Sequence, residues 1–222
     1  MILVDNFSNT IGNYDNVHTW SHTTAGNNRI LIVGLASLSD SGTPHNFEGV
    51  TYNGIATTLL RRDTVFGIQV ELWYMVAPTP GPHNIIATHD DSFDNAFVIA
   101  MGYSFNGVDQ ADPFGNEATD DTVNDLLTSL TTTTANEMIV DVAMKYDTAN
   151  ALIANGGQTA HIITTGGAGF GIYGAMSSKL IPSAGSASTG YTYTDDQDGI
   201  ISSVALKPAA APIVNNTFFS FF

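Results

Sequence analysis

Paired carboxylates on strands would indicate glycoside hydrolysis, and of the four glutamates only Glu71 lies in a strong strand pattern. Glu71 lies in an alternating segment, residues 70–76, and its only acidic neighbour is Asp63. Glycosidases need two carboxyl groups about 5 to 10 Å apart. Because Asp63 falls in an expected loop, the pattern favours Glu71 as a solvent-facing residue on a half-exposed strand. The sequence therefore predicts no catalytic pair.

Serine and glycine patterns point away from two further chemistries. Residues 102–107 read Gly-Tyr-Ser-Phe-Asn-Gly, one residue too long for a nucleophile elbow, with no helical pattern after them. The glycines of residues 166–171 lack the Lys-Ser/Thr pair of a phosphate loop. Both segments are typical of turns next to strands.

Histidines give no zinc pattern. His18 and His22 have the spacing that chelates zinc on a helix, but their segment alternates like a strand. On a strand they would stand about 13 Å apart, too far for one ion. The other histidines are single residues beside expected turns, where a surface or hydrogen-bonded role is favoured: His45, His83, His89 and His161.

Two acidic turns could hold calcium. One contains Asp195, Asp196 and Asp198, and the other contains Asp90, Asp91 and Asp94. Hard cations favour clustered carboxylates. Neither turn has the downstream glutamate of an EF-hand, and aspartate is an ordinary β-turn residue. The pattern favours turns, so we expect no metal or other cofactor to be essential.

Aromatic residues on expected strands form a candidate sugar platform. Flat rings stack on pyranoses, but strand aromatics more often fill a core or an interface. The residues concerned are Trp20, Tyr52, Trp73, Tyr74, Tyr191 and Tyr193. Asn6 and Asn215 begin glycosylation sequons, which matter only in a eukaryotic secretory pathway.

Composition narrows the partners. The formal net charge of −15 repels phosphate backbones and anionic membranes, so we expect neither nucleic acid nor membrane as a partner. Cysteine is absent, which excludes disulfides and thiolate chemistry. Charged residues make up only 12% of the chain. The first ten residues, MILVDNFSNT, show no cleavable signal, which favours a protein made in the cytosol over a secreted enzyme.

Strand patterns recur along the chain with turn residues between them, and helical periodicity is nearly absent. Asn53-Gly54 is the dipeptide best suited to a two-residue hairpin turn. We find no internal repeat, and we interpret residues 118–130 as a loop entering a strand. The pattern predicts an all-β, antiparallel, jelly-roll-like sandwich. The expected strands are residues 2–5, 18–23, 29–38, 47–52, 55–61, 69–76, 83–88, 96–105, 126–132, 138–145, 158–165, 169–179, 187–193 and 200–206.

The C-terminal residues differ from the rest. Residues 208–212 read PAAAP, a stiff linker that separates a single domain, residues 1–207, from an aromatic tail. Four phenylalanines left in water would form an apolar patch that soluble monomers avoid. We therefore expect the tail to dock on another copy or on a neighbouring assembly protein. Its expected contacts are Ile213, Val214, Phe218, Phe219, Phe221 and Phe222.

An ordered series of motifs resembles a known module. It runs from RILIVG at Arg29 through VTYNG at Val50, VELWYMVAP at Val70 and YSFNGVDQADP at Tyr103 to SVALKP at Ser203. Together these are similar to a β-sandwich module of bacteriophage virion proteins and bacterial secreted or surface proteins. The resemblance spans residues 19–208 and implies the fold and a virion, extracellular or cell-surface location, and the module has no established activity to carry over.

These observations favour a non-enzymatic structural subunit of a virion or other extracellular assembly. The alternative is a carbohydrate-binding or adhesion module, which would show Trp20 or Trp73 exposed beside polar groups in a shallow groove. A glycoside hydrolase or lyase would need paired carboxylates in a cleft, and the sequence supplies no such pair.

Overall fold

The computed structural model describes residues 1–13, 15–39, 42, 46–89, 96–146, 150–167 and 170–210. These residues form strands joined by turns and include no helix, so none of them forms a helix able to cross a membrane. The predicted all-β class is confirmed. The strands are β1 (Leu3–Asn13), β2 (Val17–Thr24), β3 (Ile30–Ser39), β4 (Phe47–Tyr52), β5 (Ile55–Ala56), β6 (Thr58–Val65), β7 (Ile68–Val76), β8 (Gly81–His89), β9 (Ala96–Asn106), β10 (Phe114–Asp120), β11 (Asp125–Thr132), β12 (Glu137–Tyr146), β13 (Ile153–Ala154), β14 (Thr159–Gly167), β15 (Phe170–Ile181), β16 (Gly185–Thr192) and β17 (Gly199–Leu206).

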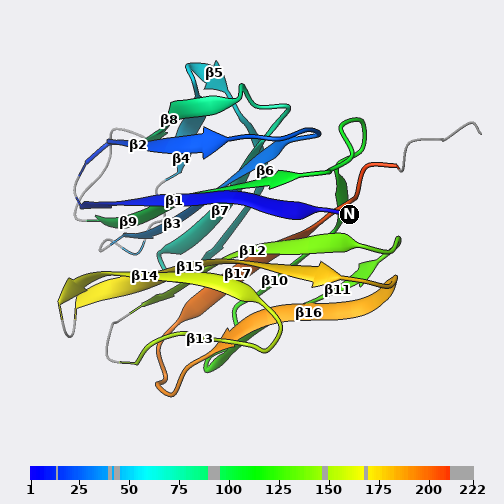
Figure 1. Ribbon diagram of the computed structural model, residues 1–222. Coiled ribbons are helices and arrows are strands. Elements are labelled where there is room, and N and C mark those ends of the chain that lie inside the picture. Colours follow the sequence, from blue (N-terminus) through cyan, green and yellow to red (C-terminus); the bar gives the residue numbers. More distant parts are fainter. Residues whose placement is uncertain are drawn as a thin grey trace, which may run out of the picture.

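Four sheets are stacked face to face (Figure 1). The two inner sheets have the orders β1-β9-β3-β7-β6 and β10-β17-β12-β15-β14, and the two outer sheets have the orders β2-β8-β4-β5 and β11-β16-β13. Each ladder is antiparallel, which confirms the predicted sandwich, whereas jelly-roll connectivity is not confirmed. Because each inner sheet is covered on both faces, β3 and β17 are buried along their whole length and β12 is buried except at Tyr146.

The predicted hairpin at Asn53-Gly54 is confirmed. Both residues have positive φ, 52° and 72°, as a type I′ turn requires. The returning strand is shorter than expected, because it ends at Ala56 and the chain then crosses to the inner sheet as β6. Thr57 marks the crossing, since its backbone N–H and its hydroxyl both donate to the Val50 carbonyl.

Two other expectations needed correction. The first strand continues to Asn13 rather than ending at Asp5, because β1 pairs with β9 along its length. The segment interpreted as a loop entering a strand begins within a strand that was not expected, β10, and the expected strand from residue 126 is β11. Strand β10 has few apolar residues because it lies at a sheet edge, so its pattern lacked the hydrophobic alternation used to recognise strands.

The chain is built from two halves with the same strand connectivity, although no repeat was evident in the sequence. Replacing β1, β2, β3, β4, β6, β7, β8 and β9 by β10, β11, β12, β13, β14, β15, β16 and β17 converts the sheet orders of one half into those of the other. Only β5 has no counterpart in this scheme. We refer to residues 1–106 as the first half and to residues 114–206 as the second half.

Local features repeat at equivalent positions. Strands β2 and β11 share one alternating burial pattern and the sequence Ser-x-Thr-Thr. Asn28 and Asn136, four residues after those strands, both have positive φ. The bulge between Val4 and Asn6 in β1 corresponds to the irregularity between Phe114 and Glu117 in β10. Matching turns, bulges and registers show that the halves share one backbone plan.

The inner sheets of the two halves pack against each other to form the main apolar core. The contacts between the halves are reciprocal. Strand β3 packs against its counterpart β12. The contact of β7 with β12 matches that of β15 with β3, and the contact of β6 with β17 matches that of β14 with β9. At the centre, a Cβ placed on Gly34 would lie 3.1 Å from Cγ2 of Val142, its counterpart in the other half. The interface is therefore closely packed where the halves meet.

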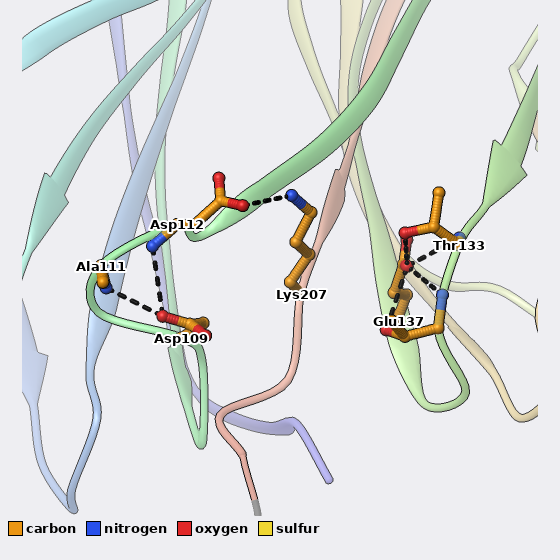
Figure 2. A network of polar contacts seen from close by, with 7 residues as sticks. Asp109, Ala111, Asp112, Thr133, Glu137 and Lys207 are labelled. Carbon is orange, nitrogen blue, oxygen red and sulfur yellow. Dashed lines mark hydrogen bonds and ion pairs between the residues drawn. The ribbon is translucent and has the colours of Figure 1, made fainter.

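A short linker, residues 107–113, joins the halves, and hydrogen bonds within it and to Lys207 hold it in place (Figure 2). Asp109 accepts hydrogen bonds from the backbone N–H groups of Ala111 and Asp112, at 2.8 and 3.1 Å. Lys207, at the end of the last strand, donates to Asp112 at 2.7 Å. The same view shows Glu137, whose Oε1 accepts from Thr133 and fixes the turn before β12.

Candidate functional site

The candidate aromatic platform does not form an exposed surface, and the favoured interpretation, that these rings fill a core, holds for five of the six. Trp20 and Trp73 are each only 7% exposed and pack between the outer and inner sheets of the first half. The other four aromatic residues are also packed against protein: Tyr52, Tyr191 and Tyr193 are buried, and the ring of Tyr74 contacts Phe114 at 4.6 Å. The five buried rings therefore present no face to a sugar.

The interpretation of Glu71 as solvent-facing is wrong. Its carboxylate is fully buried under the outer sheet and accepts from Arg62 Nε at 2.8 Å, from Gln69 Nε2 at 2.6 Å and from Trp73 Nε1 at 2.6 Å. Burial raises the pKa of Glu71, and the hydrogen bond and charge of Arg62 oppose that rise. Strand β7 alternates as expected, but a second sheet covers the face that was assigned to solvent.

Asp63 lies in β6 rather than in a loop, and it does not pair with Glu71. Its carboxylate binds Arg61 and accepts a hydrogen bond from Ser202 of the second half. Each acid is thus held by an arginine of β6, Asp63 by Arg61 and Glu71 by Arg62.

A polar relay links the first strands. Trp20 Nε1 donates to Ser8 Oγ at 3.1 Å, Ser8 lies 2.7 Å from His22 Nδ1, and His22 Nε2 lies 3.0 Å from Ser104 Oγ. Ser104 in turn donates to Asp5 at 2.9 Å. One set of hydrogen positions satisfies every member when His22 is neutral with its proton on Nε2.

The state of His22 fits that assignment. Burial lowers the pKa of His22 to about 4, although the negative charge of Asp5 opposes the shift. Ser8 and His22 thus have the spacing of a nucleophile and a base. Yet Ser8 Oγ is already bonded to His22 and Trp20, and Ser8 lines neither of the two cavities described below. We assign the relay to positioning β1 against β2 and β9.

The remaining histidines that the structure describes take no part in this relay. His18 and His89 are buried beside Phe47, with a ring separation of 3.8 Å between His89 and Phe47. His161 stacks on Phe7 at 3.7 Å, and His83 meets the Tyr52 ring at 5.5 Å. His45 lies outside the described residues. No cluster of three histidines, aspartates or glutamates suited to a metal occurs in the described part of the chain.

Asp195, the first residue of one acidic turn, is held by a lysine. Lys145 is fully buried, and its Nζ lies 2.7 Å from Asp195 Oδ2, which also accepts from Asn150 at 3.1 Å. The same ammonium lies 5.2 Å from the centre of the Tyr193 ring. Calcium needs six or more oxygen ligands, and this carboxylate is already neutralised. The other acidic turn, with Asp90, Asp91 and Asp94, lies outside the described residues.

Asp141 is a second buried acid that the sequence patterns left unmarked. It accepts from Ser177 Oγ at 2.7 Å and from the Tyr191 hydroxyl at 2.9 Å. Burial raises the pKa of Asp141. From the strand registers, Asp141 occupies the position equivalent to Val33 of the first half, and Ser177 the position equivalent to Trp73. A single acid inside the apolar run of β12 was the signal for this network, because such a residue needs buried partners.

A cavity opens where the two halves meet at one end of the stack. Its volume is about 500 Å³, within the range of ligand sites, and its walls come from Leu38, Ser39, Gly42, Phe66, Ile68, Tyr146 and Asp198. Phe66 is 80% exposed and has a φ of 42°. Phe66 was not among the residues expected to form a site. The sequence feature that could have revealed it is the two-residue turn between strands, which holds Phe-Gly instead of the favoured Asn-Gly. A second, smaller hollow of about 390 Å³ lies over β5 and the end of β7.

Comparison with protein-family profiles gives no match, and a search of curated proteins finds no similar sequence. The functional assignment therefore depends on the geometry of the described residues and on the resemblance stated above.

Proposed function

We propose that the chain is a non-enzymatic structural subunit of a virion or other extracellular assembly, in which copies associate through the free edge of β1. The observation that supports this most directly is the character of that edge. Strand β1 is 11 residues long and lies at the outside of its sheet, where only β9 pairs with it. Figure 1 shows it in dark blue along the front of the stack. Its outer side therefore offers unpaired backbone groups.

The side chains of β1 do little to prevent pairing with another chain. Leu3, Val4 and Ile11 are 53%, 45% and 45% exposed, and the strand contains no lysine, arginine or proline. Proteins usually protect long edges with such residues, so an unprotected apolar edge is a template for an added strand. Apart from the bulge near its start, β1 keeps regular register from Phe7 to Asn13.

The opposite edge of the same sheet contrasts with β1. Strand β6 carries Arg61, Arg62 and Asp63 in consecutive positions. Arg61 spans the two halves, with ion pairs to Asp63 and to Glu117 of β10. This edge is charged and linked to its neighbour, so the sheet has one protected edge and one suited to pairing.

The chain leaves the described fold beside the start of β1. Ala209 N donates to the Gly107 carbonyl, and Gly107 lies against the Met1 carbonyl. Figure 1 shows the red C-terminal segment passing the N-terminus. The segment expected as a connector, residues 213–222, lies outside the described residues. A tail that starts here leaves the fold close to a β1 edge. We propose that it pairs with the β1 edge of another copy.

Light scattering with size exclusion tests the proposal. The full chain should assemble beyond the monomer mass, and removing residues 213–222 should return it to the monomer. Val4→Lys and Ile11→Lys should each weaken assembly, because a lysine on an edge strand opposes pairing. Association should strengthen with salt, since copies with a net charge of −15 repel one another.

Ile162→Lys is the matched control. Ile162 is 39% exposed on β14, the edge strand of the other inner sheet, and its replacement should leave assembly unchanged. A monomeric full chain at high concentration would refute the proposal. Assembly that survives the deletion would show that the tail is not the connector.

A further inference from the structure

We infer that the cavity between the halves binds a neutral saccharide, with Phe66 as the stacking surface. This goes beyond an assembly role and uses none of the residues of the β1 edge. The nearest sequence-based expectation, a platform built on Trp20 and Trp73, fails because those rings are buried.

The first observation is the turn that carries Phe66. Val65 pairs with Ile68, so Phe66-Gly67 is a two-residue hairpin turn, with φ values of 42° and 82°. Another two-residue hairpin turn of the chain, with positive φ at both residues, is formed by Asn53-Gly54, the favoured dipeptide for this turn. A bulky aromatic residue at positive φ is a backbone outlier, and such strain concentrates at functional sites.

The strained backbone at Phe66 does not serve to bury its side chain. Phe66 is the most exposed large hydrophobic side chain among the described residues. Its turn is nevertheless fixed: Ser39 N donates to the Gly67 carbonyl at 3.0 Å, and a Cβ on Gly67 would lie 3.0 Å from Gly42 Cα. The ring is thus presented to solvent from a rigid backbone, which limits the ordering cost of binding.

The second observation is the chemistry of the cavity walls. Asp198 is half-buried, and its carboxylate makes no hydrogen bond or ion pair with any described residue. The same holds for the hydroxyl of Tyr146, whose backbone N–H donates to the Asp198 carbonyl. Leu38 and Ile68 form an apolar floor. The cavity therefore combines an exposed ring, two free polar groups and an apolar base.

A neutral saccharide matches this combination. The C–H face of a pyranose packs on an aromatic ring, and its hydroxyls donate to a carboxylate and accept from a phenol. Acidic sugars fit poorly because Asp198 and the net charge of −15 repel them. Walls from both halves, Phe66 from the first and Asp198 from the second, make the site a property of the intact chain.

Binding of the labelled full chain to a printed array of neutral and acidic oligosaccharides tests the inference. Neutral glycans should give signal and acidic ones should not, and calorimetry with the best neutral oligosaccharide should give the dissociation constant. Phe66→Asn should weaken that binding by about tenfold or more, since one stacking contact is lost. Asp198→Asn should also weaken it, and Phe66→Tyr should retain it.

Phe66→Asn separates binding from folding. Asparagine suits the positive φ of this turn, so the variant should keep or raise the thermal midpoint while it loses the glycan. Ile153→Asn, at an exposed position that does not line the cavity, is the control and should bind like the unmodified chain. An aromatic ring beside a carboxylate could also bind a quaternary ammonium ion. The inference is therefore overturned if no neutral glycan binds and tetramethylammonium binds instead. It is also overturned if no neutral glycan binds at all, or if Phe66→Asn binds the glycan normally.

Discussion

The guanidinium of Arg62 reaches the buried carboxylate of Glu71 from the neighbouring strand, with 2.8 Å between Nε and Oε1. Arg62 is partly exposed while Glu71 is not, so one residue brings a charge from the surface to an acid under the outer sheet. Arg62 Nη2 also donates to the Phe47 carbonyl, which ties β6 to β4 of the outer sheet. The pair joins the two sheets of the first half.

Glu71→Gln should therefore lower the free energy of unfolding by about 3 to 5 kcal/mol, because an uncompensated arginine and misdirected donors remain. Urea unfolding measures the loss. Glu48→Gln removes an exposed glutamate of β4 and should change stability by less than about 0.5 kcal/mol. Equal effects at the two positions would contradict a structural role for Glu71.

Acid should destabilise the chain through His22. An unfolded histidine titrates near pH 6.5, whereas the pKa of His22 in the fold is about 4. Above pH 6.5 both states are neutral, and between pH 6.5 and 4 only the unfolded state binds the proton. The free energy of unfolding should fall by up to about 3 kcal/mol across this window.

His22→Gln should be less stable at neutral pH but should show a shallower loss between pH 6.5 and 4, as measured by urea unfolding at several pH values. His83→Gln, at a half-buried position outside the relay, should keep the steep dependence. An unchanged slope in His22→Gln would show that other groups cause the acid sensitivity.

Gly34→Val should lower the free energy of unfolding by about 1 to 3 kcal/mol, because the added methyls would meet Val142 and Met176 in a packed interface. Val142→Ala should partly restore stability in the double variant, since it frees space at the contact. A double-mutant cycle measures this coupling. Strict additivity would mean that the two residues do not compete for the same volume.

Calcium and chelator should leave the thermal midpoint unchanged, because Lys145 already neutralises Asp195. Differential scanning calorimetry with added calcium and with excess chelator provides the measurement. A midpoint that falls in chelator and recovers with calcium would show an ion bound in spite of this pair.

The sequence was sufficient for the strand content and for turns with strong local signals. Asn53-Gly54 and the apolar run from Ile30 were predicted because their patterns depend on local chemistry. Glu71 was misjudged because alternation shows that a strand has two faces but not what covers each face. In a four-layer stack both faces of β7 are covered, and a charged residue on one of them needs a buried partner.

The repeat escaped detection because its shared motifs are short and widely spaced. Ser21 and Ser129 begin the shared Ser-x-Thr-Thr, and Gly81 and Gly185 follow equivalent Pro-x-x turns. Between these motifs, apolar residues of the first half correspond to polar residues of the second, as Trp73 corresponds to Ser177. The cavity was missed for a related reason, since its walls come from residues far apart in sequence.

The contact between Gly34 and Val142 has a consequence for how such a core can vary. If each half were a separate, identical molecule, the residue at this central point would meet its own copy. Two valines would collide there, and two glycines would leave a hole. Joining both halves in one polypeptide removes that constraint, so a small residue can face a large one and each half can accept changes its twin does not share.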